Sequence, residues 1–266
     1  MKGRALPPWL IAITAAVYAF LHIPLLVLVA FSFNDSKFVN WEGFTFRWYQ
    51  ELMEKDALFE ALWVSLEVGI ASTVLSAVLG TLLAMGLARH RFAGRTVMES
   101  LVYVPVVTPE IMVGVSLLLL FGWFRLDLGI DLPPMLKIII AHVAFNISFV
   151  TIVVRARLEG MDRNLEEAAM MLGADEITAF WRVTVPQLWP GILSGALLAF
   201  TMSFDDYVIT SLLTGAGSST LPILVYNMAA KNIEPTINAI STVILVGTTL
   251  LIYASERLTR DQPLKH

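Results

Sequence analysis

The sequence contains no cysteine, and its histidines are few and scattered. The absence of Cys from the 266 residues excludes disulfides, thiolate metal sites and cysteine nucleophiles. The four histidines are far apart, and no two have the i,i+3 or i,i+4 spacing of metal ligands on a helix. We therefore expect neither a metal nor a cofactor in this chain.

Charged residues are also scarce. Asp, Glu, Lys and Arg make up 15% of the chain, whereas about 25% is usual in soluble proteins. The net charge is −4, with no basic patch suited to nucleic acid. No G-x4-G-K-[S/T] phosphate-binding loop occurs. The chain is therefore not expected to bind nucleic acid, or to hydrolyse ATP by itself.

Apolar residues are abundant instead. They make up 57% of the chain, and the mean hydropathy is +0.72. A soluble core of this length cannot bury so much apolar surface. A membrane-spanning helix needs roughly 20 apolar residues, and six runs meet this requirement. The runs are Trp9–Phe33, Ala61–Ala88, Leu101–Phe124, Met135–Val154, Gln187–Thr214 and Pro235–Tyr253. We predict an all-α membrane bundle of six transmembrane helices in a single domain, residues 1–266.

The basic residues predict the orientation of this bundle. The ends and loops on one side of the six runs hold 12 Lys and Arg, and those on the other side hold 6. Cytoplasmic loops carry the excess of Lys and Arg. We therefore expect both termini in the cytoplasm. On the outer side, the aromatic-rich loop Asn34–Glu60 predicts a short interfacial helix, and Gly215–Glu234 predicts a surface or re-entrant helix.

The longest inner connection, about residues 162–186, has a helical pattern. Asp162 is a good N-cap, and the small and apolar residues from Leu165 to Leu172 recur on one helix face. Gly173 suits the end of a helix, and a second short helix is expected from Asp175 to about Arg182. Spacing alone leaves two interpretations, a loop packed on its own bundle or a docking surface for another protein.

This connection resembles a known motif. Glu167-Ala168-Ala169, then Gly173, then Val183-x-Val185-Pro186 is similar to the EAA loop of binding-protein-dependent ABC importer permeases, E-A-A-x3-G-x9-I-x-L-P. Val at both aliphatic positions is a mild departure. The resemblance implies a type I ABC importer permease fold and a coupling helix. Glu167, Ala168, Ala169, Gly173 and Pro186 would then serve coupling to a separate ATPase, which binds ATP and Mg.

Further segments resemble the spermidine/putrescine permeases in particular, above all the shorter second subunit. These segments are Ala30–Asn34, Trp48-Tyr49, Pro109–Ile111, Ser203–Asp206, Leu221-Pro222 and Glu234–Ala239. The resemblance implies polyamine import across a bacterial cytoplasmic membrane. The implied partners are a second permease subunit, an ATPase dimer and an external substrate-binding protein. Permeases for opines, thiamine, phosphonates and iron share much of the pattern.

The acidic residues within the spans give evidence on the substrate that does not depend on this resemblance. Glu67, Glu110, Asp205 and Asp206 lie in the apolar runs, and no Lys or Arg lies deep in any run. Ionisable groups at this depth usually face a bundle interior or a water-filled path. Carboxylates attract ammonium groups, and the rings of Phe204 and Tyr207 can add cation–π contacts. We expect these six residues to line a path for cations.

Each acidic residue also has a structural alternative. Glu67 is close to the outer end of its run. Glu110 follows Pro105 and Pro109, so it can cap a kinked or broken helix. His142 is expected to be a hydrogen-bonded helix-packing residue. Two other classes remain open for the whole chain: an ion-coupled secondary transporter, and a membrane scaffold in which these acids only pack.

Overall fold

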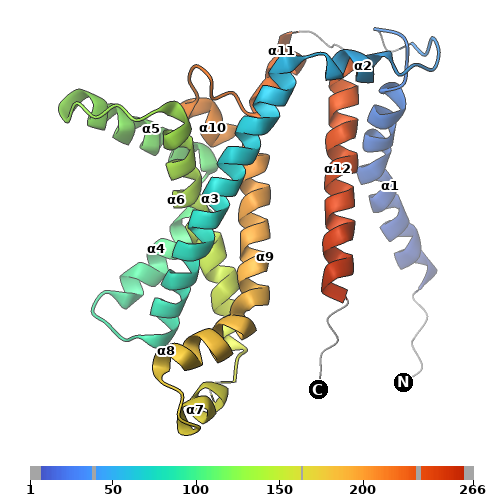
Figure 1. The fold of residues 1–266 in the computed structure, drawn as a ribbon. Coiled ribbons are helices and arrows are strands. Elements are labelled where there is room, and N and C mark those ends of the chain that lie inside the picture. Colours follow the sequence, from blue (N-terminus) through green and yellow to red (C-terminus); the bar gives the residue numbers. More distant parts are fainter. Residues whose placement is uncertain (1–6, 38–39, 163, 232–234, 261–266) are drawn as a thin grey trace. The chain divides into compact units, whose positions relative to one another are not determined.

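The computed structural model describes residues 7–37, 40–162, 164–231 and 235–260, and these residues fold almost entirely into helices (Figure 1). Contacts along the chain define two compact units. Residues 1–58 together with 225–266 form the first unit, and residues 59–224 form the second. The sequence-based division into one domain stays a prediction.

The first unit contains α1 (Pro8–Phe31), α2 (Arg47–Met53) and α12 (Pro235–Arg260). Helices α1 and α12 run side by side, and α2 packs against one end of α12 (Figure 1). Trp48 of α2 is 2% exposed, and its indole Nε1 donates a hydrogen bond to the Asn34 carbonyl at 2.6 Å. The short helix expected in the aromatic-rich loop is therefore present as α2.

The second unit contains the remaining helices, apart from residues 56–58 and 225–231, which belong to the first unit. They are α3 (Asp56–Arg89), α4 (Arg95–Val107), α5 (Glu110–Asp127), α6 (Pro134–Glu159), α7 (Asn164–Met171), α8 (Glu176–Ala179), the π-helix η1 (Phe180–Thr184), α9 (Val185–Phe204) and α10 (Val208–Leu213). Helix α11 (Leu221–Lys231) begins in this unit and extends into the first. Helices α5 and α10 lie at one end of α6 and α9, and α7 and α8 lie at the other (Figure 1).

Glycines allow α3, α6 and α9 to approach one another closely. A Cβ atom added at Gly80 of α3 would lie 2.8 Å from the side chain of Val150 of α6. A Cβ at Gly195 of α9 would lie 3.3 Å from the same valine. Small residues at helix crossings are typical of membrane helix packing, because they let backbones meet. Val150 is therefore held between two glycine positions.

Four helical stretches of the described chain are long and apolar enough to cross a membrane: Pro8–Phe31, Asp56–Arg89, Pro134–Glu159 and Glu176–Phe204. A fifth crossing results if the bent pair α4 and α5 counts as one. The apolar part of α12, Pro235–Leu250, is shorter. The chain is thus a multi-pass membrane protein, and six crossings remain a prediction.

The expected third span is broken rather than continuous. Helix α4 ends at Val107, α5 begins at Glu110, and the two axes are bent by 110°. Thr108 is extended, with φ −76° and ψ 133°, as is typical of a residue that precedes proline. Pro109 also lacks an N–H to continue the helix. The prolines that predicted a kink thus produce a complete break.

The expected fifth span is also shorter than predicted. Helix α9 ends at Phe204, and the chain does not continue as one helix to Thr214. Asp205 and Tyr207 leave the helical path, and Asp206 caps a new short helix, α10. An aspartate that accepts backbone N–H bonds favours a helix start over a helix interior, which explains the break.

Candidate functional site

The carboxyl group of Asp206 lies at the centre of a buried polar cluster. Its oxygens accept hydrogen bonds from Thr210 N at 2.8 Å, Thr210 Oγ1 at 2.6 Å and Ile209 N at 3.3 Å. His142 Nε2 of α6 lies 3.2 Å from the carboxylate, and the His142 and Asp206 side chains are 2% and 3% exposed. Asp206 therefore caps α10 and ties it to α6.

Glu110 joins this cluster from the start of α5. Helix α5 packs on α10 so closely that a Cβ at Gly114 would lie 2.7 Å from Leu212. This packing places the carboxyl group of Glu110 close to that of Asp206. Two carboxyl groups in contact repel each other when both are ionised, and a shared proton or a bound cation relieves that repulsion. The pair is therefore suited to hold a positive charge.

Asp205 and its neighbours lie beside this cluster. Asp205 ends α9 and is exposed, whereas Phe204 and Tyr207 are half-buried. The Phe204 ring stacks on Phe200, with centroids 5.6 Å apart. Glu67 is exposed on α3, and no recorded contact of the described residues joins it to the cluster. The structure thus brings Glu110 and Asp206 together, with Asp205 adjacent and Glu67 separate.

Helix α6 contributes to this cluster through residues outside the predicted cation path. His142 is the buried, hydrogen-bonded packing residue that the sequence predicts, and its Nε2 lies 3.2 Å from Asp206 Oδ2 and 3.0 Å from Thr210 Oγ1. One turn further along, Asn146 donates to Ser203 Oγ of α9 at 2.8 Å. Two polar residues at i,i+4 in an otherwise apolar helix were the available signal.

The second candidate region is the connection between α6 and α9, at the opposite end of the unit. Asp162 Oδ1 accepts the Asn164 N–H at 3.0 Å, and α7 ends at Met171. Gly173 has φ +96°, and Ala174 N donates to the Ala169 carbonyl at 3.1 Å. This is a left-handed glycine at a helix end, where a side chain would be strained. The expected glycine elbow is present.

The second short helix differs from the expectation. Asp175 caps it by accepting the Thr178 N–H at 2.9 Å, and these hydrogen bonds lower the pKa of Asp175. The helix does not stop near Arg182, because α8 continues through the π-helix η1 into α9. Pro186, in the first turn of α9, has no N–H for the preceding turn, and the wider π-helical turn accommodates it.

The surface of this connection is apolar and exposed. Met171 and Leu172 are 89% and 91% exposed, and Ile177 and Trp181 are 70% and 64% exposed. Glu167 and Ala168 are exposed as well, and Ala169 is half-buried. An apolar surface of this kind usually marks an interaction site.

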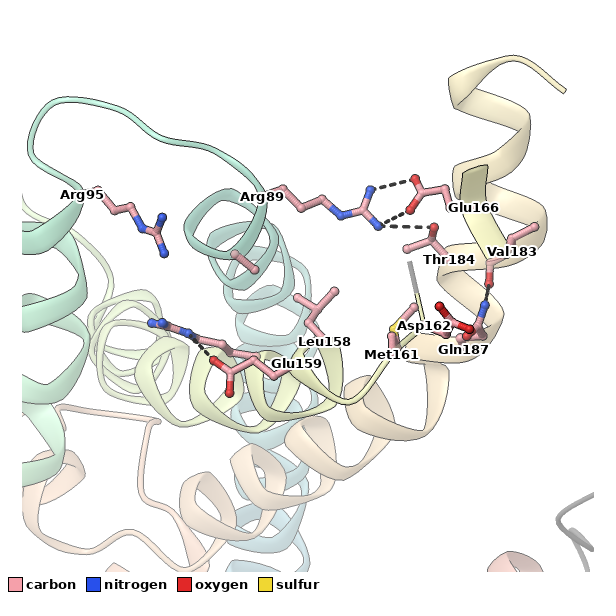
Figure 2. A pocket seen from close by; sticks show the side chains of 12 residues that line it. Arg89, Arg95, Leu158, Glu159, Met161, Asp162, Glu166, Val183, Thr184 and Gln187 are labelled. Atoms are coloured by element: carbon pink, nitrogen blue, oxygen red, sulfur yellow. Dashed lines mark hydrogen bonds and ion pairs between the residues drawn. The ribbon is translucent and has the colours of Figure 1, made fainter. Parts of the chain in front are cut away.

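A cavity of about 110 Å³ lies where the ends of α3 and α6 meet α7 and η1, and charged residues of several elements line it (Figure 2). Arg89 at the end of α3 donates from both terminal nitrogens to the Glu166 carboxylate, at 2.8 and 2.6 Å. Arg155 pairs with Glu159 within α6 and also with Glu99 of α4. The charges that line the cavity are thus largely paired with one another.

The sequence of this chain is similar to sequences of known proteins. The family described as "Binding-protein-dependent transport system inner membrane component" matches residues 76–260. The chain is 42% identical over 247 residues to the putrescine transport system permease protein PotI of Escherichia coli K12, which covers 90% of this chain and 86% of PotI. It is 36% identical to the spermidine/putrescine transport system permease protein PotC of the same strain, covering 93% and 92%.

Solved structures agree in fold. A chain of a bacterial ABC transporter that imports the acidic polysaccharide alginate aligns with a TM-score of 0.75, over 96% of this chain and 95% of that one. The identity is 15%, so this likeness bears on the fold alone. A chain of an amino acid ABC transporter aligns with a TM-score of 0.59 over 79% of this chain.

Proposed function

Because this chain belongs to the inner membrane component family of binding-protein-dependent transport systems, we propose that it is the permease subunit of an ABC importer for spermidine or putrescine. The assignment of the substrate rests on the similarity to two polyamine permeases along nearly the whole chain. The chain is the non-catalytic membrane component, and ATP and Mg would be bound by a separate ATPase.

The acidic cluster supports a cationic substrate. Glu110 and Asp205 are the carboxylates that remain accessible beside Asp206, and neither makes an ion pair with a recorded Lys or Arg of the described chain. A polyamine is a chain of ammonium groups, which such carboxylates bind. Phe204 and Tyr207 would contribute cation–π contacts along the same path. Glu67, on the exposed side of α3, would act elsewhere on the path.

The coupling segment supports an ATPase partner. The apolar surface around the glycine elbow is uncovered in this chain, and a groove on an ATPase subunit would bury it. Glu167, Ala168 and Ala169 would contact this partner, because they lie on exposed or half-buried faces of α7. Gly173 and Pro186 would fix the angle at which α7 leaves the membrane helices.

The proposed mechanism is alternating access. ATP binding closes the ATPase dimer, draws together the coupling segments of this chain and of a second permease subunit, and opens the path outward. An external binding protein then delivers polyamine, and hydrolysis returns the path to the inward-open state. Both termini would lie in the cytoplasm of a bacterial cell, as the excess of basic residues on that side predicts.

Uptake by the reconstituted complex tests this function. Proteoliposomes with both permeases, the ATPases and the binding protein should accumulate radiolabelled spermidine or putrescine only when ATP is present. Import driven by a proton or sodium gradient without ATP would instead establish a secondary transporter. Competition by excess unlabelled thiamine or an opine, but not by polyamine, would assign another substrate.

A further inference from the structure

Arg89 and Glu166 form an ion pair between residues 77 positions apart in the chain. Arg89 is the last residue of α3, and Glu166 lies in the first turn of α7. The contact is bidentate, and the two side chains are 28% and 22% exposed. Bidentate pairing of a planar guanidinium with a carboxylate fixes orientation as well as distance. The pair therefore sets the position of α7 relative to α3.

The same guanidinium also reaches the base of α9. Arg89 Nη2 lies 3.5 Å from the hydroxyl of Thr184, the last residue of η1, and Thr184 is 1% exposed (Figure 2). One side chain thus contacts the coupling segment and the π-helical turn that leads into α9. The neighbouring pair Arg155–Glu159 differs, because it joins two residues of a single helix.

Helix α7 also contacts η1 and α8, but these contacts bury none of its residues completely. None of its residues is buried, so no apolar core anchors it to the membrane helices. Apolar burial is ordinarily the main source of helix docking. In its absence, the ion pair adds a directional contact to the packing of α7 on η1 and so helps to determine where the helix lies.

We infer that the Arg89–Glu166 pair transmits displacement of the coupling segment to α3 and to the base of α9, so that the two residues act as positioning residues for coupling. This inference rests on the proposed function, since the displacement comes from an ATPase partner. Breaking the pair would let α7 move with the ATPase while α3 and α9 stay in place. ATP hydrolysis would then continue with less transport.

The test compares substrate imported with ATP hydrolysed in the reconstituted complex, for the single variants Arg89→Gln and Glu166→Gln and for the exchange Arg89→Glu with Glu166→Arg. Each single variant should lower the polyamine imported per ATP by about fivefold, as expected for the loss of one partly buried bidentate pair. The exchange should restore the ratio to within about twofold of the wild type. Glu159→Gln is the matched control, because it breaks the Arg155–Glu159 pair, which lies within the single helix α6.

Three results would overturn the inference. One is an unchanged ratio in the single variants, and another is an equal fall in the Glu159→Gln control. The third is loss of copurification with the ATPases in any of the variants, because the pair would then serve assembly rather than coupling. Whether the wild-type complex imports polyamine tests the substrate proposal without any variant. Basal ATP hydrolysis requires no polyamine, so it can be measured even if the substrate proposal fails. Failure of the substrate proposal is thus distinguishable from failure of the ion-pair proposal.

Discussion

Asp205 and Asp206 are adjacent in the chain but have different surroundings. Asp206 is buried and accepts several hydrogen bonds within the chain, whereas Asp205 is exposed at the end of α9. Their chemistry is the same, so their environment decides which one a cation can reach. The sequence alone could not separate them, because it does not specify where α9 ends and α10 begins.

Neutralising the two residues should therefore have different effects. Asp205→Asn should raise the KM for polyamine by roughly tenfold with little change in thermal stability, because it removes an accessible charge. Asp206→Asn should lower the thermal stability of the detergent-solubilised complex, because it weakens a buried cap. Uptake kinetics and thermal unfolding measured on both variants check this pair of outcomes. Equal effects of the two changes on KM would contradict the assignment.

His142 should matter through Asp206. His142→Ala removes one partner of a buried carboxylate, and we expect a loss of stability of about 1–3 kcal/mol. His142→Gln, which keeps a donor, should recover part of this loss. Denaturation in detergent gives the measurement, and an unchanged stability in His142→Ala would show that the contact is unimportant. The sequence predicts that His142 is hydrogen-bonded but not that Asp206 is its partner, because the partner depends on how α6 packs against α10.

At the scale of single elements, the local pattern predicted most of the coupling segment. Asp162, Gly173 and Asp175 were expected at helix ends, and the structure places each of them there. These are short-range signals, because a cap bonds within about three residues of itself. The continuation of α8 into α9 was not predicted, since π-helical turns have no comparable sequence signature.

Gly173 offers a test of the elbow. Gly173→Ala should strain the left-handed turn by about 1–2 kcal/mol, even though a Cβ there would meet no atom within 4 Å. The misplaced α7 should then reduce copurification of the ATPase. Gly86→Ala is the matched control, since Gly86 is helical and also has open space around it. An equal loss of ATPase copurification in the two variants would show that the left-handed turn at Gly173 is not needed for coupling.

Asp175 should stabilise the start of α8 in a pH-dependent way. Hydrogen bonds from Thr178 lower the pKa of Asp175, so the cap is fully formed above the ordinary Asp value and is lost as the pH falls through the lowered one. Asp175→Ala should accelerate amide exchange at Thr178, whereas Asp175→Asn should preserve protection at neutral pH. Hydrogen-exchange mass spectrometry measures both. Equal exchange in the two variants would argue against the cap.

At the scale of the whole molecule, the exposed apolar surface at the elbow should decide assembly. Leu172→Glu should abolish copurification of the ATPase, because it places a charge in a surface that we expect to be buried in the complex. Leu126→Glu is a control, since Leu126 is similarly exposed, at 84%, on α5 at the other end of the unit. Retained copurification of Leu172→Glu would place the ATPase contact elsewhere.

Hydropathy predicted the long helices well and the interrupted ones poorly. The runs at 9–33, 61–88 and 135–154 correspond closely to α1, α3 and α6. Gln187–Thr214 was predicted to be continuous, whereas Pro105 and Pro109 predicted a kink or a break in Leu101–Phe124. Mean hydropathy by itself is insensitive to a proline or a capping aspartate. The two interruptions lie together at the acidic cluster. The places where hydropathy fails are thus the places where polar chemistry occurs.

The close packing at Val150 has a mechanical consequence. Helix α9 is 20 residues long, about 30 Å at 1.5 Å per residue, and its Gly195 meets Val150 near the middle. A rod held firmly at an intermediate point can only pivot there, and its two ends then swing in opposite directions. An inward swing at Val185 would accompany an outward swing at Phe204. The spacing between Val150 and the two ends of the rod would then set the ratio of the two movements.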